Sequence, residues 1–194
     1  MTSRSTSFLN TPTLMTYSTS HTPLEVTQSN HQKTLIQVRV RFEPLFTTMY
    51  GDCRRGEVTS KLRTIEWLPA HHGGKIAITK VNSEDKSLLA ISQELDKLSG
   101  DFDEYLVPTS GTYNCRTVAG SSARSMHGYG AAIDLNAKQA DYWRWSKDLS
   151  NPVWKNRIPV EIVRIFEKHE FVWGGYWYHF DTMHFEYRPE LFLP

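Results

Sequence analysis

The sequence lacks any run of apolar residues long enough to cross a bilayer, so we expect no transmembrane segment. It also lacks an excess of one charge, because 22 lysines and arginines stand against 21 aspartates and glutamates. Such a balance gives no electrostatic case for binding nucleic acid or an anionic membrane surface. No secretory signal peptide is visible either, since Ser, Thr and Pro interrupt any apolar stretch after Arg4.

Cysteine is scarce: Cys53 and Cys115 are too few for a disulfide framework. We expect two free thiols, and a single bridge between them is the alternative if the environment is oxidising. Cys115 is expected to be a small core residue rather than a nucleophile, because no separate histidine and acid are evident to activate it.

The length of 194 residues predicts one domain with a sizeable core. Residues 1–34 are rich in Ser and Thr and poor in apolar periodicity, which predicts a disordered or loosely held arm. A wrongly assigned start that hides or replaces a targeting segment is the alternative. The domain is expected over residues 35–194, with its core at about 64–194. Residues 35–42 alternate between apolar and polar, as a half-buried strand does, although they fit the arm as well.

Further strands are expected at 64–68, 75–81 and 105–107, from their apolar and β-branched content. His71 and His72 lie in the turn between the first two of these strands. Adjacent side chains in a polar turn seldom converge on one ion, so we expect both to be exposed.

Two helices are expected. The first begins at Ser83, whose side chain is expected to cap it, and ends at Gly100. The second covers residues 159–169 and has Pro159 in its first turn.

The candidate chemistry lies in residues 125–134 (SMHGYGAAID) and 181–186 (DTMHFE). His127 and Asp134 are seven residues apart, and His184 follows fifty residues after Asp134. Two imidazoles and one carboxylate are a common ligand set for catalytic zinc, with a fourth position left open. We therefore predict a zinc site held by these three residues.

Strand periodicity supports this prediction. In the first segment, Ile133 and Leu135 fall on one face of a short strand and Asp134 on the other. In the second segment, His184 and Glu186 share a face. Two ordinary strands with partly buried polar residues are the alternative.

Two more residues are candidates for catalysis. Asp181 stands three residues before His184, where its carboxylate is placed to act as a general base. Arg116 stands eleven residues before His127. An arginine there either stabilises an oxyanion, clamps a substrate carboxylate or forms a surface salt bridge, and the sequence alone does not choose among these.

The pattern Ser-x-His-x-x-Gly-x-Ala-x-Asp followed by Asp-x-x-His resembles the M15 family of zinc D,D-carboxypeptidases and L-alanyl-D-glutamate endopeptidases. Within it, the sequence is most similar to the VanY-like branch that includes phage endolysin peptidases. Residues 113–116, 156–169 and 173–177 match the family as well. The resemblance covers about the last two thirds of the chain and weakens before Trp67.

The resemblance implies an α+β fold like that of the D,D-peptidases and the hedgehog signalling domain. We expect a single small domain with helices packed on an antiparallel sheet. It also implies a zinc-dependent peptidase that acts on peptidoglycan stem peptides, most directly as a D-alanyl-D-alanine carboxypeptidase. An L-alanyl-D-glutamate endopeptidase is the alternative activity. A metal-containing binding module is the alternative of another class, and the presence of Asp181 argues against it because a binding site needs no base.

The resemblance also favours a catalytic role for Arg116. Ser125 is expected to orient the metal site or bind substrate, and Glu186 to support His184 from behind. Glu170 stands where the family usually has glycine after a helix. A left-handed conformation there would cost on the order of 1 kcal/mol.

The substrate implies the periplasm or the cell wall, although no export signal is visible. Release of a phage enzyme by a holin and a misassigned start on a periplasmic protein both account for this. We expect a monomer.

Overall fold

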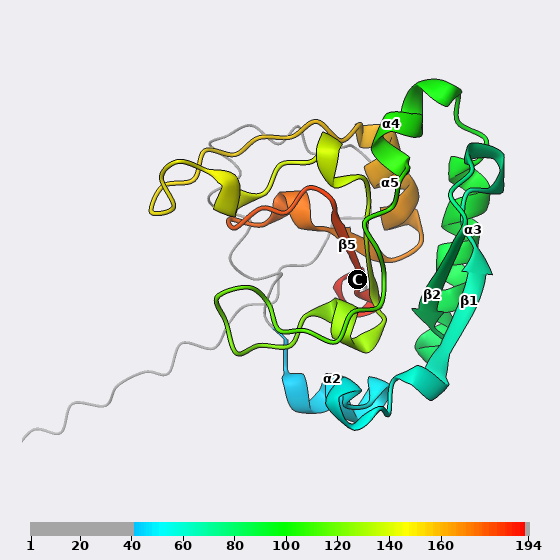
Figure 1. Cartoon of the computed structure of the whole chain (residues 1–194), viewed down its shortest axis with the longest axis vertical. Coiled ribbons are helices and arrows are strands. Elements are labelled where there is room, and N and C mark those ends of the chain that lie inside the picture. The colour runs from blue at the N-terminus through cyan, green and yellow to red at the C-terminus, as the bar shows by residue number, and fades with distance from the viewer. Residues whose placement is uncertain (1–40, 193–194) are drawn as a thin grey trace, which may run out of the picture.

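The computed structural model describes residues 41–192 of the chain. The predicted arm at 1–34 and nearly all of the predicted strand at 35–42 lie outside the described residues. Arg41 and Phe42, the first two described residues, are not in a strand. The chain then enters helix α2 (Glu43–Tyr50), which runs along the lower edge of the molecule in Figure 1.

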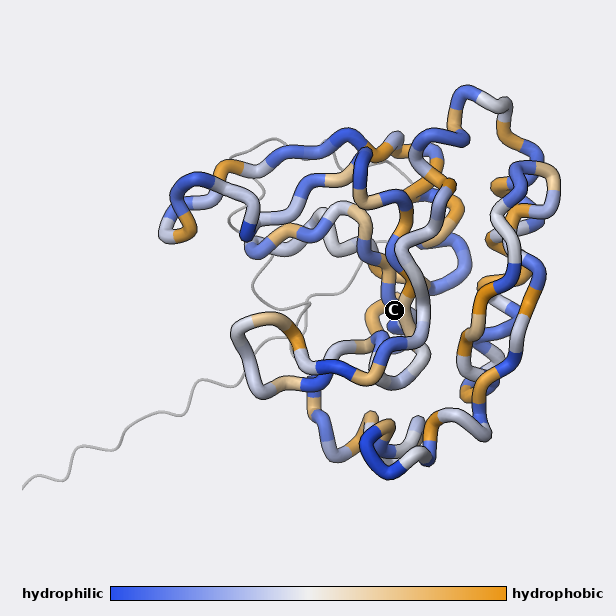
Figure 2. The backbone as a smooth tube through the Cα atoms, in the orientation of Figure 1, coloured by the Kyte–Doolittle hydropathy of each residue, from blue (hydrophilic) through white to orange (hydrophobic). Residues whose placement is uncertain are grey.

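A β-hairpin and one helix form the right-hand side of the molecule in Figure 1. Strands β1 (Leu62–Glu66) and β2 (Lys75–Thr79) pair antiparallel, with Leu62 opposite Thr79 and Glu66 opposite Lys75. Helix α3 (Glu84–Leu95) packs on both strands, and apolar residues recur along all three elements (Figure 2). The predicted strands at 64–68 and 75–81 are confirmed, with bounds that shift by two residues.

The second sheet has three strands in the order β3–β5–β4, and both pairings are antiparallel. Its strands are β3 (Ala132–Asp134), β4 (Phe171–Trp173) and β5 (His184–Tyr187). Helix α5 (Val160–Lys168) packs against β4. Two antiparallel sheets with helices packed on them confirm the predicted α+β class.

The main core lies between the two sheets and helices α3 and α5. Alternation along β3 sends Ile133 and Leu135 into this core, as predicted, and leaves Asp134 on the opposite face. Phe185 of β5 also enters it, where its ring stacks on that of Phe166 from α5 with centroids 3.9 Å apart. A fully buried Trp67 fills the core from the side of the hairpin. The apolar faces of β3 and β5 therefore anchor the strands whose other faces carry the candidate ligands.

Several local predictions are wrong. Residues 105–107 do not form a strand, because the chain makes the short helix α4 (Asp103–Leu106) there. Ser83 does precede α3, but it has a left-handed φ of 62° and its side chain makes no capping hydrogen bond. That helix ends at Leu95, well before Gly100.

His71 is buried rather than exposed, whereas His72 is exposed as predicted. Helix α4 brings the carboxylate of Asp103 against His71 Nδ1, so the imidazole has an acidic partner from a distant part of the chain. Helix α4 thus covers the turn, and the sequence around His71 does not predict this contact.

Glu170, which follows α5 where the resembled family usually has glycine, has a left-handed backbone conformation. Its φ is 66°, and its carbonyl oxygen accepts the backbone N–H of Arg188 at 2.9 Å. Its carboxylate accepts the hydroxyl of Tyr187 at 2.9 Å.

The prediction of two free thiols is wrong, because Cys53 and Cys115 form a disulfide. Cys53 follows α2 and Cys115 lies next to Arg116, so the bond connects two segments 62 residues apart in sequence. None of the described helices is long and apolar enough to cross a membrane.

Candidate metal centre

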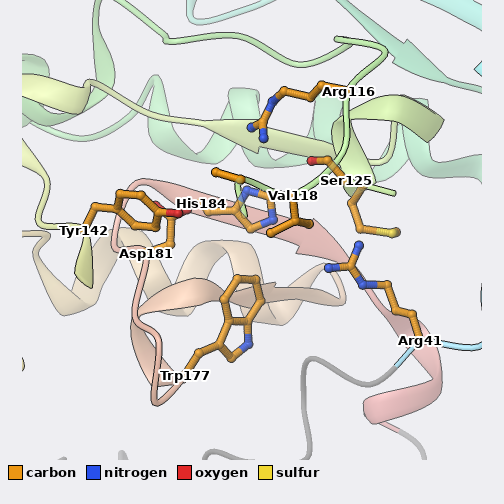
Figure 3. A pocket seen from close by; sticks show the side chains of 10 residues that line it. Arg41, Arg116, Val118, Ser125, Tyr142, Trp177, Asp181 and His184 are labelled. Atoms are coloured by element: carbon orange, nitrogen blue, oxygen red, sulfur yellow. The ribbon is translucent and has the colours of Figure 1, made fainter. Parts of the chain in front are cut away.

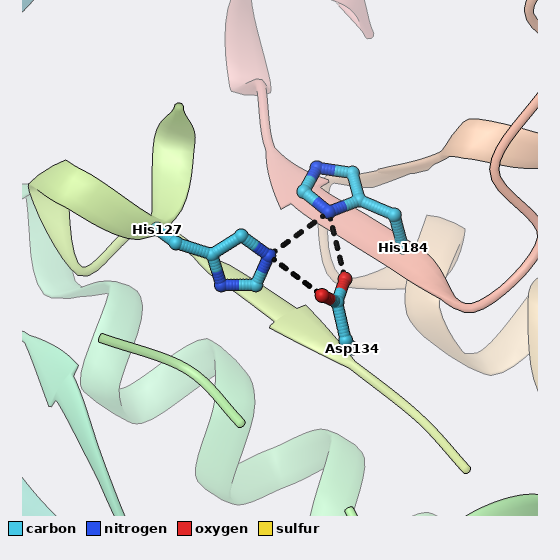
Figure 4. Close-up of side chains that lie close together, drawn as sticks. All are labelled: His127, Asp134 and His184. Carbon is cyan, nitrogen blue, oxygen red and sulfur yellow. Dashed lines mark hydrogen bonds and ion pairs between the residues drawn. The ribbon is translucent and has the colours of Figure 1, made fainter. Parts of the chain in front are cut away.

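His127 is presented by a single turn of 3₁₀-helix, Met126–Tyr129, just before β3. Gly130 ends this turn with a left-handed φ of 70°, and a Cβ there would lie 2.6 Å from a methyl carbon of Leu62. The left-handed backbone conformation therefore favours glycine at this position, and a larger residue would also displace the side chain of Leu62. The turn allows the chain to reverse into β3 while the imidazole of His127 remains over the end of that strand (Figure 4).

Asp134 and His184 are direct cross-strand partners in the register of β3 and β5. Asp134 Oδ1 lies 2.9 Å from His184 Nδ1, and Asp134 Oδ2 lies 3.1 Å from His127 Nε2. The two imidazoles face each other, with His127 Nε2 and His184 Nδ1 3.1 Å apart. Figure 4 shows all three side chains directed at one point.

This donor set fits a zinc ion. Each residue offers one ligand atom within 4.8 Å of the others. The two imidazole nitrogens are 3.1 Å apart and each lies 2.9–3.1 Å from a different carboxylate oxygen of Asp134, which is close to the roughly 3.3 Å between ligands of tetrahedral zinc. Small movements of the side chains would therefore admit the ion.

The remaining nitrogen of each imidazole has a fixed partner. His127 Nδ1 lies 2.5 Å from the carbonyl oxygen of Thr112, and His184 Nε2 lies 3.1 Å from Glu186 Oε2. A carbonyl and a carboxylate both accept hydrogen bonds, so these contacts place the imidazole protons away from the centre. His127 Nε2 and His184 Nδ1 are left with lone pairs directed at the ion position, as metal-binding histidines require.

Glu186 is fully buried and is held by two arginines as well as by His184. Arg188 Nη1 donates to Glu186 Oε1 at 3.0 Å, and Arg41 Nη2 lies 3.7 Å from Glu186 Oε2. Burial alone would raise the pKa of Glu186, but the charge of Arg41 and the hydrogen bond to His184 bring it below its usual range. Glu186 is therefore ionised, which suits an acceptor for His184 Nε2–H.

The centre itself attracts positive charge. Burial alone would lower the pKa of His184, but its hydrogen bonds to Asp134 and Glu186 and their negative charges raise the pKa to about 9. For Asp134, burial acts to raise the pKa, but the two histidines outweigh it and the net shift is downward. A proton and a metal ion compete for the same imidazole nitrogen, so carboxylates that favour one also favour the other.

A cavity opens beside the three residues and is lined by several of the predicted site residues (Figure 3). Asp181, Arg116, Ser125 and His184 all line it, and Ser125 is buried at its edge. The structure thus brings together every residue that the sequence singled out, with Glu186 behind His184. Their chemical roles remain predictions.

Asp181 is held by a tight turn ahead of β5. Its N–H donates to the carbonyl oxygen of Gly174 at 3.0 Å, and its own carbonyl oxygen accepts the N–H of His184 at 3.2 Å. Gly174 is required here, because a Cβ would lie 2.5 Å from Asp181 O. The turn places the carboxylate of Asp181 and the imidazole of His184 on the same cavity.

Arg116 approaches the centre from the segment after the disulfide. Its Nη2 lies 3.9 Å from Asp134 Oδ2, and its side chain is 42% exposed. The backbone of this segment is bound to the turn that carries His127, since Asn114 N donates to His127 O at 3.0 Å and Ser125 N to Arg116 O at 3.1 Å.

Sequence reasoning missed four contributors to the site. Arg41, Tyr142 and Trp177 line the cavity, and the backbone carbonyl of Thr112 orients His127. A carbonyl oxygen leaves no signature in a sequence. Arg41 belongs to the segment interpreted as a strand or an arm, where an arginine carries no functional signal of its own.

Residues 119–187 match the family model described as D-alanyl-D-alanine carboxypeptidase. This confirms the resemblance to the M15 peptidases over those residues, and the matched family is one of hydrolases. The match includes the three candidate ligands and Asp181, but neither Arg41 nor Arg116. No curated protein and no solved structure matches the chain.

Proposed function

We propose that the protein is a zinc-dependent peptidase that removes the terminal D-alanine from peptidoglycan stem peptides. The observation that carries this proposal is the convergence of His127, Asp134 and His184 beside a cavity that Asp181 and Arg116 also line. The family model matched by residues 119–187 supports the D-alanyl-D-alanine substrate.

Each residue would have a distinct role. His127 Nε2, His184 Nδ1 and a carboxylate oxygen of Asp134 would hold the ion. Zinc in such a site is a Lewis acid that polarises a peptide carbonyl. The carboxylate of Asp181 would accept a proton from the attacking water as its oxygen bonds to the carbonyl carbon. Asp181 would then pass this proton to the leaving nitrogen as the C–N bond breaks.

Arg116 would stabilise the negative charge that develops on the carbonyl oxygen. Its Nη2 is 3.9 Å from a ligand oxygen of Asp134, which puts the guanidinium close to the reacting bond. Its partial exposure suits a group that must turn toward a substrate, whereas Glu186 and Arg188 are buried and hold His184 in a fixed orientation.

The disulfide agrees with a substrate outside the cytoplasm. Disulfides persist in the periplasm and at cell surfaces and are rare where thiols are kept reduced. The Cys53–Cys115 bond therefore supports the periplasm or the cell wall as the place of action.

The decisive experiment combines metal analysis with turnover. The purified protein is analysed for metal and then incubated with muropeptides, and the products are identified by mass. We expect one zinc per chain and loss of one alanine from pentapeptide stems. Cleavage between L-alanine and D-glutamate would assign the endopeptidase activity instead. Stoichiometric zinc without any cleavage would indicate a binding module.

A further inference from the structure

A second arginine lines the cavity from the side opposite the exposed Arg116. Arg41 reaches into it from the segment before α2, and Figure 3 shows its guanidinium directed toward Ser125 and Val118. Its side chain is only 10% exposed, against 42% for Arg116. A long cationic side chain is seldom this buried without an anionic partner.

The contacts of Arg41 fix its position without using its full capacity. Nη1 donates to the carbonyl oxygen of Arg124, the residue before Ser125, at 3.1 Å. Nη2 lies 3.7 Å from Glu186 Oε2, which is longer than a hydrogen bond. Among the described residues, these contacts engage one or two of the five N–H donors of a guanidinium. The described residues thus leave N–H donors of Arg41 that an anion in the cavity can accept from.

Glu186 has two partners that lie closer to it than Arg41 does. Arg188 and His184 contact its two carboxylate oxygens at 3.0 and 3.1 Å, both shorter than the distance to Arg41. Arg41 adds positive charge that helps to keep Glu186 ionised. The cavity therefore has a buried cation whose nearest carboxylate is already hydrogen-bonded to other groups.

We infer that Arg41 binds the free C-terminal carboxylate of the substrate peptide and so selects terminal over internal peptide bonds. This inference rests on the proposed function, because it assumes that a peptide occupies the cavity. A terminal carboxylate lies one residue beyond the scissile bond. Arg116 Nη2 lies 3.9 Å from Asp134 Oδ2, whereas Arg41 Nη1 contacts the carbonyl oxygen of Arg124, the residue before Ser125, at 3.1 Å. The two arginines thus suit the two negative charges of a carboxypeptidase substrate, one on the reacting carbonyl and one on the terminus.

The carboxypeptidase and endopeptidase activities that the sequence left open differ in whether the substrate has a terminal carboxylate at this place. A carboxypeptidase substrate brings a carboxylate into the cavity, and a guanidinium binds it through paired N–H donors. An endopeptidase substrate brings an uncharged amide to the same place and adds no carboxylate for Arg41, whose anionic neighbour would still be Glu186 at 3.7 Å. Arg41 therefore favours the carboxypeptidase.

The test compares two substrates on the full-length zinc-loaded protein. One is a stem peptide ending in D-alanyl-D-alanine with a free carboxylate, and the other is the same peptide with a C-terminal amide. The variants are Arg41→Gln, Arg41→Lys and the matched control Arg63→Gln. Arg63 pairs with Asp85 at 2.9 Å on the hairpin, outside the cavity. Zinc content is measured for each variant.

The readout is the ratio of kcat/KM for the acid to that for the amide. We expect Arg41→Gln to lower this ratio at least about thirtyfold, as for loss of one partner of a buried charge pair, and Arg63→Gln to leave it unchanged. Arg41→Lys keeps the charge without the planar fork, so its ratio should fall between the two. The ratio is insensitive to a general loss of zinc, which lowers both rates together.

Three results would overturn the inference. Equal losses on acid and amide would show that Arg41 acts through Glu186 and the metal centre. A ratio that falls in a fourth variant, Arg116→Lys, and not in Arg41→Gln would assign the carboxylate to Arg116. A wild-type ratio near one would exclude carboxylate recognition altogether.

Failure of the proposed function is seen separately. If the wild-type protein cleaves neither peptide, calorimetry of acetyl-D-alanyl-D-alanine and its amide still measures whether the cavity prefers the acid. A preference lost in Arg41→Gln would keep the inference without peptidase activity, and no preference would end it.

Discussion

Three buried histidines in the described part of the protein contact carboxylates: His127 and His184 belong to the candidate metal site, and His71 does not. His71, at the end of the 3₁₀ turn Pro69–His71, meets Asp103 of α4, whose side chain is 46% exposed. His184 lies between Asp134 and Glu186, which are 16% and 0% exposed. A buried histidine with an acidic partner is thus not sufficient to indicate a site.

His71 and the candidate metal site differ in how many metal-binding atoms come together. Within the described part of the chain, three groups with metal-binding atoms meet at His127, Asp134 and His184 and nowhere else. His71 Nε2 is buried and faces no polar partner in that part of the chain, so nothing further is brought to the ring. The register of β3 and β5 supplies what the turn at His71 lacks, which is a second and a third donor from independent segments.

Exchanging the histidines for alanine should give the largest contrast. His184→Ala removes a candidate ligand, so we expect stoichiometric zinc to be lost and turnover to fall to that of the metal-free protein. His71→Ala should keep both and lower only the melting temperature. Zinc analysis, turnover and thermal melts on the two variants make the comparison. Normal zinc and turnover in His184→Ala would remove it from the site.

Asp181 tests whether the centre is catalytic or only binds metal. Asp181→Asn keeps the shape of the side chain but cannot accept a proton. We expect kcat to fall by about 10² to 10⁴, with the fold and most of the zinc retained. Reduced zinc affinity would instead make Asp181 a fourth ligand. Full activity with a lowered melting temperature would restrict it to the turn.

The carboxylates that contact His184 and His71 should also differ in how much they affect zinc affinity. Glu186→Gln weakens the acceptor for His184 Nε2, and we expect zinc affinity to fall by about 10- to 100-fold. Asp103→Asn, the matched change at His71, should leave zinc affinity unchanged. Competition with a chelator measures both. Equal affinities in the two variants would contradict a supporting role for Glu186.

Arg116 should show a smaller effect. Arg116→Lys keeps the charge but not the planar fork. We expect zinc to be retained and kcat/KM to fall at least about tenfold, equivalent to roughly 1.4 kcal/mol of transition-state stabilisation. Unchanged kinetics on the cleaved muropeptide would make Arg116 a surface residue.

The smallest expected effect concerns Glu167, a carboxyl group whose pKa is raised by burial. Burial raises the pKa of Glu167 to about 7, despite a hydrogen bond from Tyr176 and the charge of Arg164. The folded protein then holds this proton more tightly than the unfolded chain, so Glu167 favours folding below pH 4.5 and loses that contribution as the pH rises through 7. Glu167→Gln should therefore be more stable than the wild type above pH 7, by on the order of 1 kcal/mol. Denaturant melts at pH 5 and 8 test this, and a gap that does not widen with pH would contradict it.

Asp134 and His184 were readable from the sequence because they lie in two short strands with a period of two. Alternation alone placed Asp134 and His184 on polar faces, and the packing of Ile133 and Phe185 confirms those faces.

The features that the sequence did not predict depend on contacts between distant segments. Asp103 covers His71 from 32 residues away, and Arg41 reaches Glu186 from the other end of the chain. The pairing of the cysteines likewise depends on the fold that brings Cys53 to Cys115. No local period or propensity encodes such encounters, so the exposure of His71 and the state of the thiols were predicted wrongly.

The disulfide also acts on the unfolded chain. It closes a covalent loop across a sequence separation of 62 residues, and that loop contains the whole β1–β2 hairpin and α3. Restricting a loop of this length lowers the conformational entropy of the unfolded state, which by the chain-entropy model stabilises the fold by about 4 kcal/mol. The loop contains no candidate metal ligand, yet it ends at the residue before Arg116. Even when the hairpin opens, the segment that carries Arg116 therefore remains tethered to the end of α2.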